Sequence, residues 1–252
     1  MNKILLNILT HGDELAGKRV ADGISERYPQ LLKNGLDIII ANELAYQQGK
    51  RYVDSDLNRV FPGKPDGNYE ERRAYELAPI VSSYDFVIDV HSTESGTEDT
   101  VIVTKIDEET KDALIAVSPR YILFMNIKPD KSLISRAKVG IAFEMGKDAD
   151  EKTVEKTMQG IESLLTYAKL TSVEKTLGHR TEAFEVFQEI VKPKNARLNA
   201  DIKNFHRIET GSIYAKSKDG SPIKAEFDFY PVIFGNDNYE TIFGFAARKI
   251  DF

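Results

Sequence analysis

Short apolar runs alternate with amphipathic segments along most of the chain, and this alternation restricts the fold more than any other feature. Continuous apolar runs suit strands that are buried on both faces, whereas a three-to-four-residue recurrence of apolar residues is typical of helices. Strands that alternate with helices form sheets with substantial parallel pairing. The sequence therefore predicts an α/β fold with a mixed, largely parallel sheet flanked by helices. The expected strands are residues 3–9, 36–41, 85–90, 100–104, 121–125 and 138–145, and the clearest helices are 69–83 and 150–170.

The pattern changes after about residue 174. Residues 183–187 and 225–229 alternate apolar and polar side chains, and residues 218–222 carry turn signals. Such alternation indicates antiparallel strands with one solvated face. We expect a catalytic domain over residues 1–173 and a small antiparallel β domain over residues 174–252, which is a candidate active-site lid.

Composition excludes several classes of protein. The net charge of −6 and the pI near 5.4 argue against nucleic acid as the main partner. The chain has no cysteine, which excludes disulfides and thiolate ligands and suits a reducing compartment. Residues 1–10 do not resemble a secretory signal, and no apolar run approaches the roughly 20 residues of a membrane helix. We therefore expect a cytoplasmic protein without a membrane partner, whose oligomeric state the sequence does not indicate.

Two of the four histidines directly follow expected strands. His11 comes after the first strand and His91 after the third, while His179 and His206 lie in polar stretches and are expected at the surface. Ligand sites in α/β sheets form at the carboxyl ends of strands, so His11 and His91 can converge there. Glu14 lies three residues beyond His11. Two imidazoles and a carboxylate would leave a zinc ion one open position, although this short motif is also compatible with a histidine in a loop and a glutamate in a first helical turn.

Glu144 is unusual because it ends an otherwise apolar run. A buried carboxylate is costly unless it is paired, binds a metal or takes up a proton, so a general base is one interpretation and a solvent-exposed strand end is the other. Residues 42–66 form a long stretch with little periodicity, which we expect to be a loop, and loops of this length tend to be either functional or disordered. It contains Arg51 and Arg59, which either bind carboxylates or belong to a solvated turn.

Together these segments resemble a known family. Residues 11–14 (HGDE), 56–59 (DLNR), 89–91 (DVH) and 143–146 (FEMG) occur in the order seen in the succinylglutamate desuccinylase/aspartoacylase family, which is related to zinc carboxypeptidases. The resemblance covers the chain to about residue 170, and the rest more loosely. Four ordered motifs are far more specific than any one of them.

The resemblance implies a zinc-dependent hydrolase that cleaves the amide bond of a small N-acyl amino acid. It implies one Zn²⁺ per chain, held by His11, Glu14 and His91. Glu144 matches the general base that works with a zinc-activated water. Arg51 matches the arginine that polarises the scissile carbonyl and stabilises the oxyanion.

The resemblance also implies a substrate-binding set. Asn58 and Arg59 match the pair that binds the α-carboxylate, and Tyr239 matches a tyrosine that reaches into the site from the C-terminal part. Aspartoacylases have a second substrate-binding arginine where this chain has Ile134. Arg136 and Lys131 are candidate replacements, although neither aligns directly with that position. This departure leaves undetermined which acyl group or side-chain carboxylate the substrate carries.

Two alternative functions and the role of Asp89 stay open at this point. The same chemistry would suit a zinc carboxypeptidase that acts on short peptides, and the pattern would also suit a non-catalytic homologue that binds a metal or a carboxylate. Asp89, two residues before His91, could orient that histidine or cap a neighbouring loop.

Overall fold

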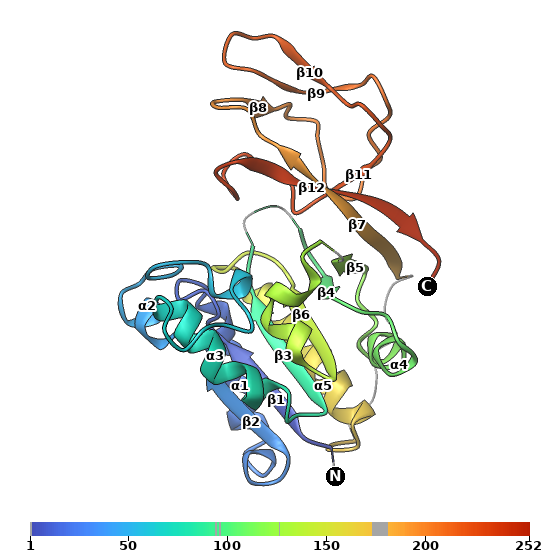
Figure 1. Ribbon diagram of the computed structural model, residues 1–252. Coiled ribbons are helices and arrows are strands. Elements are labelled where there is room, and N and C mark those ends of the chain that lie inside the picture. Colours follow the sequence, from blue (N-terminus) through green and yellow to red (C-terminus); the bar gives the residue numbers. More distant parts are fainter. Residues whose placement is uncertain (1, 94, 96, 126, 173–180) are drawn as a thin grey trace.

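A nine-stranded sheet forms the centre of the protein (Figure 1). The computed structural model describes residues 2–93, 95, 97–125, 127–172 and 181–252. The strand order is β11-β12-β7-β5-β4-β6-β3-β1-β2, and a separate small sheet has the order β10-β9-β8. The strands are β1 (Ile4–Ile8), β2 (Leu36–Ile40), β3 (Phe86–His91), β4 (Thr100–Val103), β5 (Tyr121–Met125), β6 (Val139–Glu144), β7 (Glu182–Val191), β8 (Arg197–Leu198), β9 (Ile213–Lys216), β10 (Pro222–Lys224), β11 (Tyr230–Val232) and β12 (Ile242–Ile250).

The pairing is mixed and largely parallel, which confirms the predicted fold class. β2, β1, β3 and β6 run parallel to one another, as do β4, β5 and β7. The pairs β4–β6, β7–β12 and β11–β12 are antiparallel. The central strands are buried on both faces, as their continuous apolar sequences predict.

Helices cover both faces of the sheet. α1 (Ala16–Arg27), α4 (Glu108–Val117) and α5 (Glu151–Tyr167) share one apolar core with Ile4, Leu6 and Ile8 of β1. α3 (Tyr69–Val81) packs on the other face in a second core that includes Leu5. Successive side chains of a strand point to opposite faces, so β1 anchors both cores.

The long loop is more ordered than its sequence suggests. Residues 42–66 contain the single-turn helix α2 (Glu43–Gln47) and the 3-10 turn η2 (Leu57–Arg59). Asn42 starts α2 by accepting a hydrogen bond from the Ala45 N–H. Such short elements give too few residues for a periodic signal. Further 3-10 turns are η1 (Leu31–Lys33), η3 (Pro129–Lys131) and η4 (Leu133–Arg136).

The C-terminal strands extend the main sheet as well as forming a lobe. β7 pairs in parallel with β5, and β12 and β11 follow at the edge, while β8, β9 and β10 form the lobe opposite the N-terminus (Figure 1). The expected domain boundary after residue 173 lies outside the described residues. The sequence predicted a strand over residues 225–229, but the structure has none there. This segment bends, and its one β-bridge joins Phe229 to Ile208.

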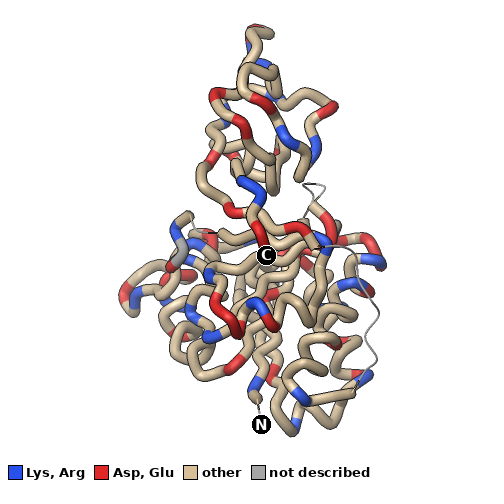
Figure 2. The backbone as a smooth tube through the Cα atoms, turned by 90° about the vertical axis from the view of Figure 1, so that its right-hand side faces the viewer, with Lys and Arg blue, Asp and Glu red and all other residues tan. Residues whose placement is uncertain are grey.

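Acidic and basic residues are interspersed along the backbone of the body and the lobe (Figure 2). Within the described part of the chain, no helix has the length and apolar character needed to cross a membrane.

Candidate metal and substrate site

Three parallel strands deliver the predicted residues to one edge of the sheet. His11 follows β1, and His91 and Glu144 are the last residues of β3 and β6. His91 lies directly opposite Glu144 in the β3–β6 register. β1 ends at Ile8, and Leu9, with a φ of 56°, turns the chain sharply before His11. The carboxyl ends of these strands therefore bring both histidines together, as the sequence predicted.

Glu14 joins the two histidines. Its Oε1 lies 2.7 Å from His11 Nδ1, and its Oε2 lies 2.9 Å from His91 Nδ1. One ligand atom from each of the three residues lies within 4.8 Å of the others, and all three residues are buried. These residues could hold a metal ion.

The outer nitrogen of each imidazole faces a second carboxylate. His11 Nε2 lies 3.2 Å from Asp56 Oδ1, and His91 Nε2 lies 2.8 Å from Asp89 Oδ2. Histidines that bind metals commonly donate their other N–H to a carboxylate, which fixes the tautomer and the ring orientation. Both imidazoles thus present Nδ1 to the shared centre, which is the arrangement that a metal site requires.

Electrostatics around the group also fit a cation. Burial alone would lower the pKa of His11 and His91, but the facing carboxylates outweigh burial and raise both pKa values. Burial alone would raise the pKa of Glu14, yet the two imidazoles hold it well below its usual range. The centre is therefore a place where positive charge is stabilised between carboxylates. A divalent cation can replace the Nδ1 protons there while Asp56 and Asp89 keep accepting the Nε2 protons.

Asp89 is fixed from the neighbouring strand. Its Oδ1 accepts hydrogen bonds from Asn7 Nδ2 and Thr10 Oγ1, each at 2.7 Å. Asp89 is fully buried, and its pKa is lowered because His91 and these donors outweigh burial. These contacts support the interpretation that Asp89 orients His91.

Gly12 brings the loop with Arg51 against His11. A Cβ atom on Gly12 would lie 2.3 Å from the Tyr46 backbone nitrogen, so only glycine permits this close approach to α2. The Gly12 N–H donates to the Arg51 carbonyl at 3.1 Å. The Arg51 guanidinium then lies 3.0 Å from both Glu14 Oε1 and His11 Nε2.

Glu70 holds the loop from beneath. This glutamate of α3 is fully buried, and its carboxylate accepts hydrogen bonds from the N–H groups of Val53, Asp54 and Ser55 and from Asn42 Nδ2. A buried carboxylate with four donors is well compensated for its lost hydration. The loop between Arg51 and Arg59 is therefore tied to the body of the protein.

Asn58 and Arg59 lie on η2, beside the candidate metal site. The N–H of Leu133 donates to Asn58 Oδ1 at 2.8 Å, which leaves the Asn58 amide nitrogen on the side of His91, 3.4 Å from its Nε2. The Arg59 guanidinium donates to the Asn58 carbonyl. Arg59 forms no ion pair with any residue that the structure describes, in contrast to Arg51. The positive charge of Arg59 is therefore available for a ligand.

Glu144 is poised for proton transfer. Burial raises the pKa of its carboxyl to about 7, against the opposing influence of His91. Its Oε2 is buried and has no hydrogen-bond partner in the described part of the chain. A carboxyl group that titrates near neutral pH is suited to accept and return a proton.

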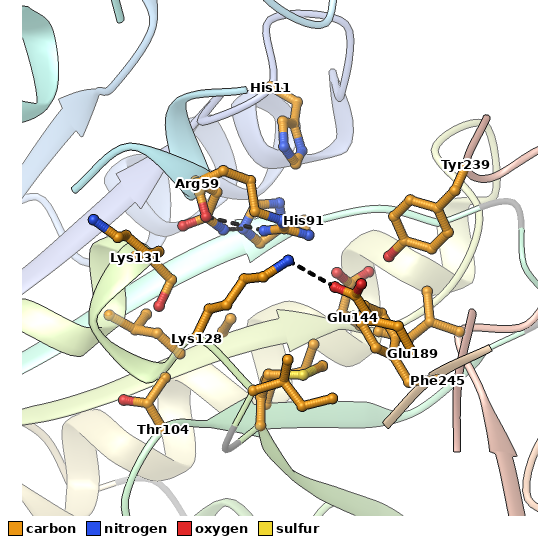
Figure 3. A pocket seen from close by; sticks show the side chains of 18 of the residues that line it. His11, Arg59, His91, Thr104, Lys128, Lys131, Glu144, Glu189, Tyr239 and Phe245 are labelled. Carbon is orange, nitrogen blue, oxygen red and sulfur yellow. Dashed lines mark hydrogen bonds and ion pairs between the residues drawn. The ribbon is translucent and has the colours of Figure 1, made fainter. Parts of the chain in front are cut away.

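These residues share one cavity with a wall from the C-terminal part (Figure 3). Tyr239 points toward Glu144, and burial raises the pKa of its hydroxyl to about 12, so it stays a neutral donor at physiological pH. The lining comprises His11, Arg51, Asn58, Arg59, His91, Ile102, Thr104, Met125, Ile127, Lys128, Lys131, Ser132, Ile134, Ala142, Glu144, Glu189, Ile233, Tyr239 and Phe245.

Arg136 is the one expected substrate-binding residue that this lining lacks. It ends η4, whereas Ile134 of the same turn lines the cavity. A 3-10 turn has three residues per turn, so side chains two positions apart point in different directions. His206 is exposed, as expected, and His179 lies outside the described residues.

Several residues of the site were not assigned a role from the sequence. Glu70 resembles any glutamate in a first helical turn, and Lys128 and Glu189 resemble ordinary surface charges. The Asp56 carboxylate belongs to a recognised motif, yet its contact with His11 depends on how the loop folds back. Spacing along the chain contains no signal for such contacts.

Comparisons with known proteins agree with this geometry. Residues 1–168 match the family model of the succinylglutamate desuccinylase/aspartoacylase catalytic domain. A probable aspartoacylase from Trichodesmium erythraeum is 25% identical over 94% of this chain and 80% of its own length. An N-acyl-aromatic-L-amino acid amidohydrolase from Xenopus laevis is 34% identical over 39% of this chain, a segment that spans 36% of the frog protein.

A solved structure shows the same fold over nearly the whole chain. Murine aminoacylase 3 superposes with a TM-score of 0.83 at 19% identity and covers 99% of this chain and 95% of its own. The family match extends from the first strand through α5 and includes all four motifs. The chain belongs to the succinylglutamate desuccinylase/aspartoacylase family.

Proposed function

We propose that the protein is a zinc-dependent amidohydrolase that cleaves small N-acyl amino acids. The observation that carries this proposal is the arrangement of His11, Glu14 and His91 around one point, with Glu144 on the adjacent strand in the same cavity. The named relatives that act on N-acyl amino acids support the reaction class. We also expect a cytoplasmic location, from the lack of cysteine.

A zinc ion held by these three residues would polarise the scissile carbonyl and acidify a water molecule. Glu144 accepts the proton of the attacking water and then delivers it to the amide nitrogen, which leaves as an amine. The Arg51 guanidinium stabilises the charge that develops on the carbonyl oxygen. Tyr239 lines the same cavity and points toward Glu144 (Figure 3), so we assign it to shielding the reacting centre from bulk water.

Arg59 and Asn58 position the substrate. The guanidinium of Arg59 binds the α-carboxylate, and the Asn58 amide nitrogen donates a further hydrogen bond. Holding the α-carboxylate on Arg59, in the cavity that Glu144 also lines, orients the amide for attack. Ile233, Tyr239 and Phe245 of the C-terminal part contribute a wall, which favours a small substrate over a peptide in an open groove.

A substrate panel tests the proposal. Zinc-loaded protein should hydrolyse N-acetyl amino acids and should lose at least about tenfold in kcat/KM when the α-carboxylate is amidated. Preferential cleavage of tripeptides would indicate a carboxypeptidase. Absence of turnover with every member, in protein that binds zinc, would indicate a non-catalytic homologue and contradict the proposal.

A further inference from the structure

One part of the cavity is lined predominantly by apolar side chains. Its walls come from β4, β5, η4, β6 and β12, which contribute Ile102, Met125, Ile134, Ala142 and Phe245. A substrate group that enters this region exchanges water for apolar contacts, which favours an apolar group. A carboxylate would lose hydration there unless a cation compensated it.

Lys128 supplies a cation at the rim of this region, but its charge is already paired. Its Nζ donates to Glu189 Oε1 of β7 at 3.0 Å, and Figure 3 shows the lysine side chain extending across the cavity to this contact. Lys128 adopts a left-handed conformation with φ of 53°, which is uncommon for a residue other than glycine. The Lys131 side chain, by contrast, extends away from Glu144 (Figure 3).

We propose that Glu189 is a specificity-determining residue that restricts the side group of the substrate to apolar chains. This inference rests on the proposed amidohydrolase function. With the α-carboxylate on Arg59, a second carboxylate on the side group would have to approach Lys128, where Glu189 repels it. A unit charge about 6 Å away disfavours such binding by roughly threefold to a hundredfold, depending on the effective dielectric.

The test compares two substrates of similar length on the zinc-loaded enzyme. N-acetylnorleucine carries an apolar side chain, and N-acetylglutamate carries a terminal carboxylate. We expect kcat/KM for N-acetylnorleucine to be higher by about tenfold or more. Glu189→Gln should lower this ratio by about fivefold or more, because Lys128 becomes available to the glutamate carboxylate.

Glu182→Gln is a matched control. Glu182 lies on the same strand, its side chain has the same 36% exposure as that of Glu189, and it pairs with Lys249 outside the cavity lining. It should leave the substrate ratio unchanged. Lys128→Gln should reduce activity on N-acetylglutamate further, because Glu189 then faces the carboxylate alone.

A wild-type preference for N-acetylglutamate, or an equal shift of the ratio in Glu189→Gln and Glu182→Gln, would overturn the inference while leaving the amidohydrolase function intact. Failure to hydrolyse any N-acyl amino acid would contradict the function instead. Calorimetric binding of the two compounds would then decide the inference. The inference is supported if the wild-type protein binds N-acetylnorleucine more tightly than N-acetylglutamate and if this difference in affinity is smaller in Glu189→Gln. Equal affinity of the wild-type protein for both compounds overturns the inference.

Discussion

The inner end of the cavity and its rim are built in different ways. At the inner end His11, Glu14, His91 and Asp89 are at most 7% exposed, and hydrogen bonds join each to its neighbours. At the rim the charged side chains reach into solvent, as does that of Lys128, which is 63% exposed. The inner end is suited to chemistry that requires fixed geometry, and the rim is suited to selection among substrates.

This contrast gives an expectation for mutations. A change at the inner end should alter turnover or metal affinity for every substrate, because these residues meet at the reacting centre. A change at the rim should alter the ranking of substrates. Changes in the distant lobe should alter neither the turnover and metal affinity nor the ranking of substrates. The expected effects below run from the largest to the smallest.

Glu144→Gln should remove most of the turnover. Glutamine has nearly the same shape but cannot accept the proton of the attacking water, so we expect kcat to fall by about a hundredfold or more. The zinc content and the thermal midpoint should stay close to those of the wild type. Full turnover in this variant, measured with the best N-acyl substrate, would remove Glu144 from the mechanism.

Asp89→Asn should weaken the metal site without emptying it. Loss of the negative charge beside His91 Nε2 makes the imidazole a poorer ligand, so we expect zinc affinity to fall by about tenfold to a hundredfold. Competition with a chelator of known affinity measures the change. Asp85→Asn is the control, because Asp85 precedes the opposite end of β3 and accepts from the Lys3 N–H. Equal affinities in both variants would contradict a role in orientation.

Glu70→Gln should loosen the loop between Arg51 and Arg59, whose backbone N–H groups Glu70 accepts from. The amide nitrogen of glutamine would face N–H donors of residues 53–55, so unfolding free energy should fall by about 2–4 kcal/mol. We expect kcat/KM to fall by about tenfold because Arg51 and Arg59 lose their fixed positions. Denaturant titration and kinetics measure the two effects. Glu76→Gln on the exposed face of α3 should change neither, and a silent Glu70→Gln would show that the loop is held in another way.

Asp228→Asn should have the smallest effect, confined to stability. The Thr210 N–H and Arg207 lower the pKa of Asp228 to about 2, below its ordinary value of 3.8. A lowered folded-state pKa stabilises the protein above pH 4, and this contribution disappears as the pH falls toward 2. The variant should therefore melt about 2 °C or less below the wild type at pH 7, with a smaller difference near pH 3. A difference that grows on acidification, or an altered substrate ratio, would contradict this account.

The inner end was predictable from the sequence because its residues occupy strand ends. Apolar runs fixed the positions of β1, β3 and β6, and parallel strands place their carboxyl ends at one edge. His11, His91 and Glu144 follow from that rule, and the family motifs then supplied Arg51, Asn58 and Arg59. The antiparallel direction of β4 did not follow, because an apolar run has no sign of direction.

The rim was not predictable for a physical reason. Lys128 and Glu189 are 61 residues apart, and they meet only because β7 pairs with β5 in parallel. The sequence suggested a separate C-terminal β region, whereas the structure continues the sheet through β7, β12 and β11. Arg136 was expected near the substrate, but the turn of η4 presents Ile134 to the cavity instead.

The metal content of single-ligand variants tests the central claim most directly. Wild-type protein and the variants His11→Ala, Glu14→Ala and His91→Ala would be loaded with zinc, dialysed and analysed by mass spectrometry. We expect about one zinc per chain in the wild type and less than about a tenth in each variant, with the folds confirmed by circular dichroism. A wild-type protein that retains no zinc, or folded variants that each keep a full equivalent, would contradict the assignment of this metal site.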